Sequence, residues 1–187
     1  MKHKALVDEN IQNLVSLATN LTQEQRRNTE KIAIAAANTI KSGGSIFWCG
    51  NGGSAADAQH LSAELIGRLI NNREPLPSIA LNSDIAALTC IANDFGYAEI
   101  YARQLKGLGK AGDLLIVLST SGNSENVLKC LDVARQTKII TVALLGKDGG
   151  EASGKSDFEI IIDSKITARI QELHKLIGHT ICQIIER

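Results

Sequence analysis

The sequence predicts an α/β fold: a doubly wound, mostly parallel sheet of five strands, with N-terminal helices before the first strand and a long C-terminal helix. Three observations indicate this class. Short apolar runs alternate with helical patterns along most of the chain, as in parallel strands joined by crossover helices. Only 3% of the residues are aromatic, so the core must consist mainly of Ile, Leu, Val and Ala, which suits helices packed on a parallel sheet. Two apolar runs are followed directly by turns rich in Gly, Ser and Asn, at the strand ends where such sheets bind ligands.

Length, charge and cysteine content narrow the class of protein. The 187 residues fit one domain spanning 1–187. Twenty basic and twenty acidic side chains cancel, which argues against broad nucleic-acid or anionic-membrane binding. No signal peptide and no apolar run of about 18 residues is recognised. The four cysteines form no C-x-x-C pair, so we expect reduced thiols in a cytoplasmic protein.

Residues 1–42 are expected to form a helical leader. Residues 4–20 carry an approximate helical stripe of apolar side chains. Thr22 and Gln25 resemble a capping box for a second helix that runs through Ile40, and a Ser-Gly-Gly turn ends it. An α/β domain does not need two leading helices to cover one sheet face. We therefore expect part of their apolar surface to form a subunit interface; the alternative is that they pack on their own domain.

Strands and helices then alternate to the end of the chain. The strands are read from short apolar runs and the helices from the segments that follow the polar turns. The expected strands are residues 45–49, 77–81, 113–118, 139–145 and 158–162. The expected helices are residues 55–69, 84–92, 99–108, 125–136 and 167–186. The expected turns between them include residues 50–54, 119–124 and 147–150.

The turn after the first strand fits the G-x-G-x-x-G/A form of a dinucleotide-binding loop, GNGGSA at residues 50–55. Its glycines let the backbone approach an anion, and the helix N-terminus offers free N–H groups. The acidic residue that should end the second strand about 20 residues later is missing, because Asp84 lies further on. Nicotinamide binding is therefore disfavoured.

The turn after the most apolar strand is STSGNS at residues 119–124. Its four hydroxyl groups and the N–H groups at a helix start form a neutral anion cradle. No lysine or arginine lies within it, yet hydroxyl and N–H donors can hold a phosphate monoester. The alternative is a hydroxyl-rich helix cap.

The helix after the first turn carries Asp57, His60, Glu64 and Arg68 on one face. His60 and Glu64, four residues apart, could share a metal or a proton path, although such a pair is more often a solvated surface pair. Arg68 is expected to pair with Glu64 or Asp57. The C-terminal helix has an apolar packing face made of Ile170, Leu173, Ile177, Ile181 and Ile184.

Four separate motifs resemble the sugar isomerase (SIS) domain family, and within it the phosphoheptose isomerase branch. They are CGNGGSAADAQHLSAELIGR at 49–68, STSGNS at 119–124, LLGKDGG at 144–150 and RIQELHKLIGH at 169–179. The resemblance implies a flavodoxin-like sheet, a homotetramer, a cytoplasmic location and one zinc ion per site. It also implies a small-molecule sugar phosphate as the partner, with no nucleic acid and no membrane.

The resemblance implies isomerisation of D-sedoheptulose 7-phosphate to D-glycero-D-manno-heptose 7-phosphate through an enediolate. This is the first step of ADP- or GDP-heptose precursor synthesis, for lipopolysaccharide or capsule. By resemblance, the zinc ligands are His60, Glu64, Gln171 and His179, a donor set that suits a catalytic zinc. Glu64 is assigned as the base, His179 as its acid partner, and zinc as the Lewis acid.

One feature of this ligand set conflicts with a straight helix. Gln171 and His179 are eight residues apart, roughly 12 Å along an ideal helix. Either Gln171 lies at a distorted helix start, or different protomers contribute the ligands. The expected substrate contacts are Asn51, Gly52, Gly53, Glu64, Asn93, Asp94, Ser119, Thr120, Ser121, Ser124 and Gln171.

The main alternative is a non-catalytic SIS-fold protein that binds sugar phosphate and associates with the bacterial replication initiator. Such a protein could lose Glu64 and His179 at little structural cost, whereas this chain has both and also Ser121. Other SIS chemistry, such as arabinose phosphate isomerisation or lactyl ether cleavage, is less favoured. The regulatory domain common in arabinose 5-phosphate isomerases is not recognised here.

Overall fold

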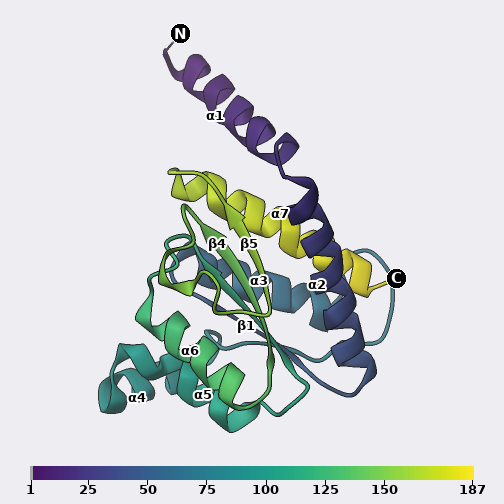
Figure 1. Cartoon of the computed structure of the whole chain (residues 1–187), viewed down its shortest axis with the longest axis vertical. Helices are drawn as coiled ribbons and strands as arrows, with labels where there is room; N and C mark the ends of the chain where they lie inside the picture. The colour runs from purple at the N-terminus through teal and green to yellow at the C-terminus, as the bar shows by residue number, and fades with distance from the viewer. Residues whose placement is uncertain (1) are drawn as a thin grey trace.

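A five-stranded sheet forms the centre of the molecule, with helices on both of its faces (Figure 1). The computed structural model describes residues 2–187. The strands, all parallel, have the order β2-β1-β3-β4-β5, which is the flavodoxin-like order of doubly wound sheets. They are β1 (Ile46–Gly50), β2 (Ser78–Ala80), β3 (Leu114–Ser119), β4 (Ile140–Gly146) and β5 (Phe158–Ile162). The predicted fold class and all five strands are confirmed.

The helices divide between the two faces of the sheet (Figure 1). One face is covered by α2 (Gln23–Lys41), α3 (Gly53–Ile66) and α7 (Thr167–Ile185). The other is covered by α4 (Ile85–Phe95), α5 (Ile100–Leu108) and α6 (Glu125–Gln136). Two short 3-10 helices, η1 (Tyr97–Glu99) and η2 (Gly150–Ala152), lie in the connections.

Burial on both faces explains why the central strands read as continuous apolar runs. Successive side chains of a strand point to opposite faces. Trp48 and Ile116 therefore pack under α3 and α7, while Phe47 and Leu115 pack under α5 and α6. A strand that is covered on both sides has no solvent face that would favour polar residues.

The two leading helices differ in how they pack. The capping box of α2 is present, with Gln25 N donating to Thr22 Oγ1 and Thr22 N donating to Gln25 Oε1, and Ile32 packs in the core. In contrast, α1 (Lys2–Thr19) contacts the start of α7, where Arg169 Nη1 donates to Asn10 O, and its N-terminal end projects from the rest of the molecule (Figure 1). Its apolar side chains Leu6, Val7, Ile11 and Val15 are each more than half exposed, at 55–56%. The helix α2 therefore packs against the sheet of its own chain. The helix α1 carries an apolar stripe that its own chain leaves exposed.

Two helix boundaries differ from the predicted ones by three residues. The helix α3 ends at Ile66 rather than residue 69, because Gly67 leaves the helical conformation. Arg73 then donates hydrogen bonds to the carbonyls of the last turn. The helix α4 continues to Phe95, so Asn93 and Asp94 lie in its last turn. No helix among residues 2–187 is both long enough and apolar enough to cross a membrane.

Candidate functional site

Both of the predicted anion-binding turns lie at one edge of the sheet. Gly50 at the end of β1 is paired with Leu118 at the end of β3, so the turns that follow these strands are neighbours. In the strand order observed here, the chain reverses its direction of winding between β1 and β3. Such a switch point is where doubly wound sheets bind ligands, at the carboxyl ends of the strands.

A polar network holds Asn51 in the first turn. Its Oδ1 accepts hydrogen bonds from Asn126 Nδ2 at 2.9 Å and from Tyr97 Oη at 3.0 Å, and Tyr101 Oη lies 3.3 Å away. Its Nδ2 donates to Asn126 Oδ1 at 2.9 Å. The amide of Asn51 is thus occupied by the protein, so the first turn offers a ligand mainly its backbone at Gly52 and Gly53. Sequence analysis did not identify Asn126, Tyr97 or Tyr101, because nothing local to these residues signals the contact.

We expect Asn126→Ala to destabilise the fold by about 1–3 kcal/mol, the usual cost of leaving a hydrogen-bonded polar group without its partner. Asn126 is only 2% exposed, and its loss would leave the Asn51 Nδ2 without an acceptor. Urea denaturation measures the change, with exposed Asn38→Ala as the control. Equal unfolding free energies for the two variants would contradict the expectation.

The hydroxyl-rich turn is braced from within and from a neighbouring loop. Ser119 Oγ accepts a hydrogen bond from Gly122 N at 3.0 Å, and Asn123 Oδ1 accepts one from Glu151 N at 2.8 Å. Gly122 has a φ of +67°, and a Cβ there would lie 1.8 Å from Gly149 O, so only glycine fits. Ser124 stands at the N-cap of α6 but makes no side-chain capping bond. A purely capping role for Ser124 is therefore not observed, and its hydroxyl is available to a ligand.

A second group of predicted residues meets where α3 and α7 pack together. His60 Nε2 lies 2.8 Å from His179 Nε2 and 3.3 Å from Glu64 Oε1. One ligand atom from each of the three residues lies within 4.8 Å of the others. The helices can approach this closely because Gly178 faces Leu61, and a Cβ at Gly178 would lie 2.4 Å from the leucine side chain.

The surroundings of His179 favour its neutral form. Burial, followed by repulsion from His60, lowers the pKa of His179, which favours its neutral imidazole, the form that binds a metal ion. The Glu64 side chain is 18% exposed and that of His60 is 44% exposed. Two imidazole nitrogens and a carboxylate oxygen that converge on one point match the donor types that zinc prefers, so the residues present fit a zinc ion.

Gln171 does not join this group within one chain. Its side chain lies against Gly53, where a Cβ would meet Gln171 Nε2 at 2.4 Å. His60 is seven residues further along α3, about 10 Å by helix geometry. Since α7 is regular from Thr167 onward, a distorted helix start does not bring Gln171 nearer.

Predictions were also made for Arg68, Asn93 and Asp94, and the structure shows the surroundings of each. The prediction that Arg68 pairs with Glu64 or Asp57 is wrong: Asp57 Oδ1 pairs with Lys175 Nζ at 2.8 Å, and Glu64 pairs with His60. Asn93 and Asp94 are exposed at the end of α4, where Asn93 Nδ2 donates to Asp94 Oδ1 at 2.8 Å.

A cavity of about 450 Å³ opens beside the first turn. Asn51 and Gly52 line it, together with Asn82, whose Nδ2 donates to Ala55 O at 2.8 Å. The Asn82 Oδ1 is buried and, among the described residues, has no hydrogen-bond partner. This cavity is therefore polar where it meets the strand ends.

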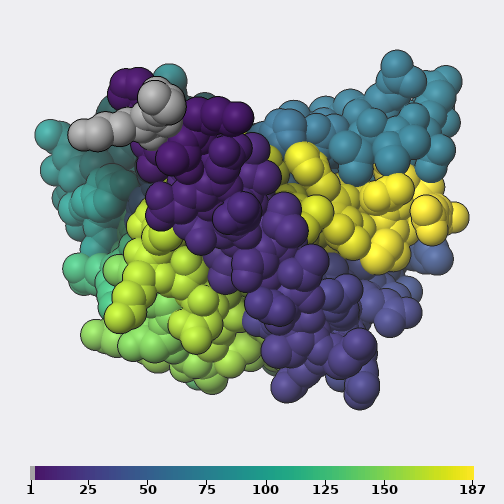
Figure 2. All heavy atoms as spheres, turned by 90° about the horizontal axis from the view of Figure 1, so that it is seen from above, coloured from purple at the N-terminus to yellow at the C-terminus, as the bar shows by residue number. Residues whose placement is uncertain are grey.

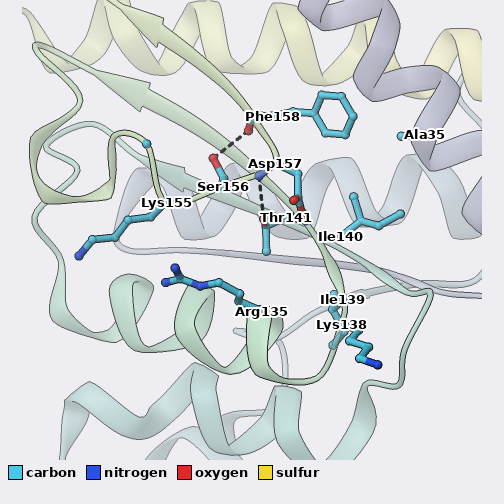
Figure 3. Close-up of a pocket in the computed structure, with 11 residues that line it drawn as sticks. Ala35, Arg135, Lys138, Ile139, Ile140, Thr141, Lys155, Ser156, Asp157 and Phe158 are labelled. Carbon is cyan, nitrogen blue, oxygen red and sulfur yellow. Dashed lines mark hydrogen bonds between the residues drawn. The ribbon is translucent and has the colours of Figure 1, made fainter.

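A larger hollow of about 600 Å³ lies at the opposite edge of the sheet, at the amino ends of β4 and β5 (Figure 3). Arg135 and Lys155 extend to one side of it, and Asp157 is turned toward Thr141 (Figure 3). Thr141 N and Thr141 Oγ1 both donate hydrogen bonds to the Asp157 carboxylate, each at 2.8 Å. None of the predicted site residues lines this hollow. The smaller cavity lies at the strand ends, where doubly wound sheets bind ligands, so position rather than size favours it as the candidate site.

His174 fastens α7 to the carboxyl ends of the strands, the edge at which the two turns lie. It is fully buried, and its Nε2 lies 3.0 Å from Leu145 O near the end of β4. Burial lowers the pKa of His174 from 6.5 to about 4. The folded protein therefore keeps this imidazole neutral in a pH range where the unfolded chain protonates it.

We expect the stability that depends on His174 to be full above pH 6.5 and to decline as the pH falls toward 4. A shift from 6.5 to about 4 corresponds to a loss of about 3 kcal/mol. Urea denaturation at pH 7 and pH 4.5 should show a larger drop for the wild type than for His174→Gln, which does not titrate. Parallel pH dependence of the two proteins would exclude His174 as the source.

Comparisons with known proteins identify a family and several relatives of this chain. The sequence pattern of the SIS domain family matches residues 9–146. The phosphoheptose isomerase of Akkermansia muciniphila is 43% identical, over 97% of this chain and 92% of its own. That of Helicobacter pylori is 52% identical, over 80% of this chain and 78% of its own.

Solved structures give the same result. The phosphoheptose isomerase of Neisseria gonorrhoeae has a TM-score of 0.86 and 36% identity, over 99% of this chain and 97% of its own. That of Francisella tularensis has a TM-score of 0.89 and 35% identity, over 98% of this chain and 96% of its own.

Proposed function

The chain belongs to the SIS domain family, as a phosphoheptose isomerase, and we propose that Glu64 and His179 carry out its proton transfer. The enzyme converts D-sedoheptulose 7-phosphate into D-glycero-D-manno-heptose 7-phosphate. The observation that carries the proposal is that these two residues, 115 positions apart in the sequence, come within 4.8 Å of one another beside the site edge.

The reaction moves one hydrogen between neighbouring carbons. Glu64, a largely shielded carboxylate, removes a proton from C1 of the open-chain ketose, and the electron pair forms the C1–C2 double bond of the enediolate. His179 gives a proton to O2 and later takes one from the O1 hydroxyl. The C1 carbonyl then forms as Glu64 returns its proton to C2.

His60, Glu64 and His179 are the residues of one chain that would hold zinc. When bound, zinc supplies a positive charge that polarises the carbonyl group and stabilises the enediolate. Gln171 is proposed to complete the set from a second protomer, because its own chain keeps it against Gly53.

The hydroxyl-rich turn is proposed to hold the phosphate. Thr120, Ser121 and Ser124 would donate hydrogen bonds to the phosphate oxygens, and Ser119 would brace the turn through its bond to Gly122 N. The N-terminus of α6 adds a favourable dipole for the dianion. Asn93 and Asp94 remain candidates for the sugar hydroxyl contacts.

We propose a homotetramer in which α1 supplies part of the contact. The support is the exposed apolar stripe of Leu6, Val7, Ile11 and Val15, since exposed apolar surface of this kind marks association sites. A cytoplasmic location is proposed because all four cysteines are free. Light scattering of the wild type and Ile11→Lys tests the assembly.

The alternative of a non-catalytic initiator-associated relative is not favoured, because the similar proteins are named isomerases. The deciding experiment incubates the purified protein with sedoheptulose 7-phosphate in D₂O, with and without a chelator, followed by proton NMR. Formation of aldoheptose phosphate with deuterium at C2 supports the proposed transfer. Absence of aldose in either sample would overturn it.

A further inference from the structure

The connection between α3 and β2 is held by two residues that the reaction does not use, Arg73 and Glu186. This segment, residues 67–76, lies beside the end of α7 (Figure 2), although it forms neither helix nor strand. Glu186 follows the last residue of α7. The segment therefore joins the C-terminal ends of the two helices that carry Glu64 and His179.

Five contacts from this segment reach the Glu186 carboxylate. Its side chain is fully buried. It accepts hydrogen bonds from the backbone N–H groups of Leu69 at 2.8 Å, Ile70 at 3.0 Å and Asn71 at 3.2 Å. Arg73 adds two contacts to Oε1, from Nε at 3.1 Å and from Nη2 at 3.0 Å.

Arg73 carries this connection on to α3. Its Nη2 donates to Glu64 O at 2.8 Å, and its Nη1 donates to Leu65 O at 2.8 Å. The last carbonyls of a helix have no partner within the helix, so the guanidinium caps the turn in which Glu64 stands. Only the planar fork of arginine can face a carboxylate and these carbonyls at once.

The other end of this connection leads to His179. Glu186 lies seven residues, or about two helical turns, beyond His179, and α7 is continuous between them. Arg73 and Glu186 therefore fix the C-terminal turn of α3 against the C-terminal turn of α7. The close approach of Gly178 to Leu61 holds the same two helices together next to His179 and His60.

We propose that Arg73 and Glu186 are positioning residues that set the distance between the Glu64 carboxylate and the His179 imidazole. The proposal rests on the proposed function, because these two residues are its acid–base pair. Neither Arg73 nor Glu186 is placed at the phosphate turn, so their loss should act on turnover rather than on substrate affinity. A displacement of about 1 Å at a reacting group can cost as much as 10²-fold in rate.

The test uses full-length Glu186→Gln and Arg73→Lys. The first keeps the shape but removes the charge, and the second keeps the charge but removes the fork. We expect kcat to fall about 10- to 100-fold in each, with KM changed less than about threefold. Zinc affinity, measured by calorimetry on the metal-free protein, should weaken by about 10-fold or more.

Asp113→Asn is the matched control. Asp113 is also a fully buried carboxylate, bonded by the backbone N–H groups of Ser45 and Lys110 and by Lys110 Nζ, each at 2.8 Å. It lies at the amino end of β3, away from the site. We expect this variant to lower the melting temperature but to keep the wild-type kcat and zinc affinity.

The outcomes separate positioning from general stability. If Glu186→Gln and Arg73→Lys lose stability as Asp113→Asn does but keep kcat and zinc affinity, the proposal is overturned. If Glu186→Gln does not fold, the Arg73→Lys values decide in the same way. If the wild type itself does not isomerise the sugar, the proposed function fails, and zinc affinity alone decides whether the two residues position the site.

Discussion

Glu64→Gln should lower kcat by about 10²- to 10⁴-fold, the range that a positioned general base contributes, and should abolish deuterium entry at C2 of the product. The amide keeps the size of the carboxylate but cannot take the C1 proton. The fold should remain intact, because the Glu64 carbonyl, not its side chain, is bonded to Arg73. This variant tests the proposed base directly.

The measurement is a coupled NMR assay of turnover and of solvent exchange. Glu30→Gln, at an exposed position of α2, is the control and should match the wild type. Wild-type exchange in Glu64→Gln would show that another group removes the proton. Equal losses in both variants would point to a preparation effect rather than to chemistry.

His179→Asn should lose both turnover and metal affinity. The imidazole lies 2.8 Å from His60 Nε2, so its removal takes one of the three converging donors and the proposed acid at once. We expect kcat to fall by about 10²-fold or more and zinc affinity to fall by at least about 10-fold. The substituted amide is too short to reach the position of Nε2.

Slow exchange at C1 should survive in His179→Asn, because Glu64 is still present, and this distinguishes the partner acid from the base. His3→Asn, on the exposed helix α1, is the control histidine. A variant that loses zinc but keeps the wild-type kcat would show that metal serves order rather than catalysis. If the variant keeps both the zinc affinity and the kcat of the wild type, His179 is not a residue of the site.

The strands and most helix boundaries were predictable because they depend on local patterns. Runs such as residues 113–118 are apolar throughout since β3 is covered on both faces. The start of α2 was also predictable, because a capping box joins residues three apart. The end of α3 was predicted three residues too late, although Gly67, a local stop signal, directly follows Ile66; the capping of its last carbonyls by Arg73 could not be predicted from a local pattern.

In the candidate site, too, some contacts follow from local spacing and others depend on tertiary packing. His60 and Glu64 share a helix face, so their proximity follows from spacing alone. The Asn51–Asn126 pair joins residues 75 apart and could not be read from any local pattern. The position of Gln171 against Gly53 likewise depends on how α7 lies along α3.

By itself the sequence determined the layered α/β fold, the two turns that are proposed to bind an anion and the residue types of the proposed acid–base site, because periodicity and turn chemistry act over a few residues. Only the tertiary structure decided which of these residues meet. It brought His179 to His60 across 119 positions, kept Gln171 away, and joined Glu186 to Arg73 across 113 positions. Such contacts depend on strand order and on the close approach of helices at Gly178, which are properties of the packed molecule rather than of any segment.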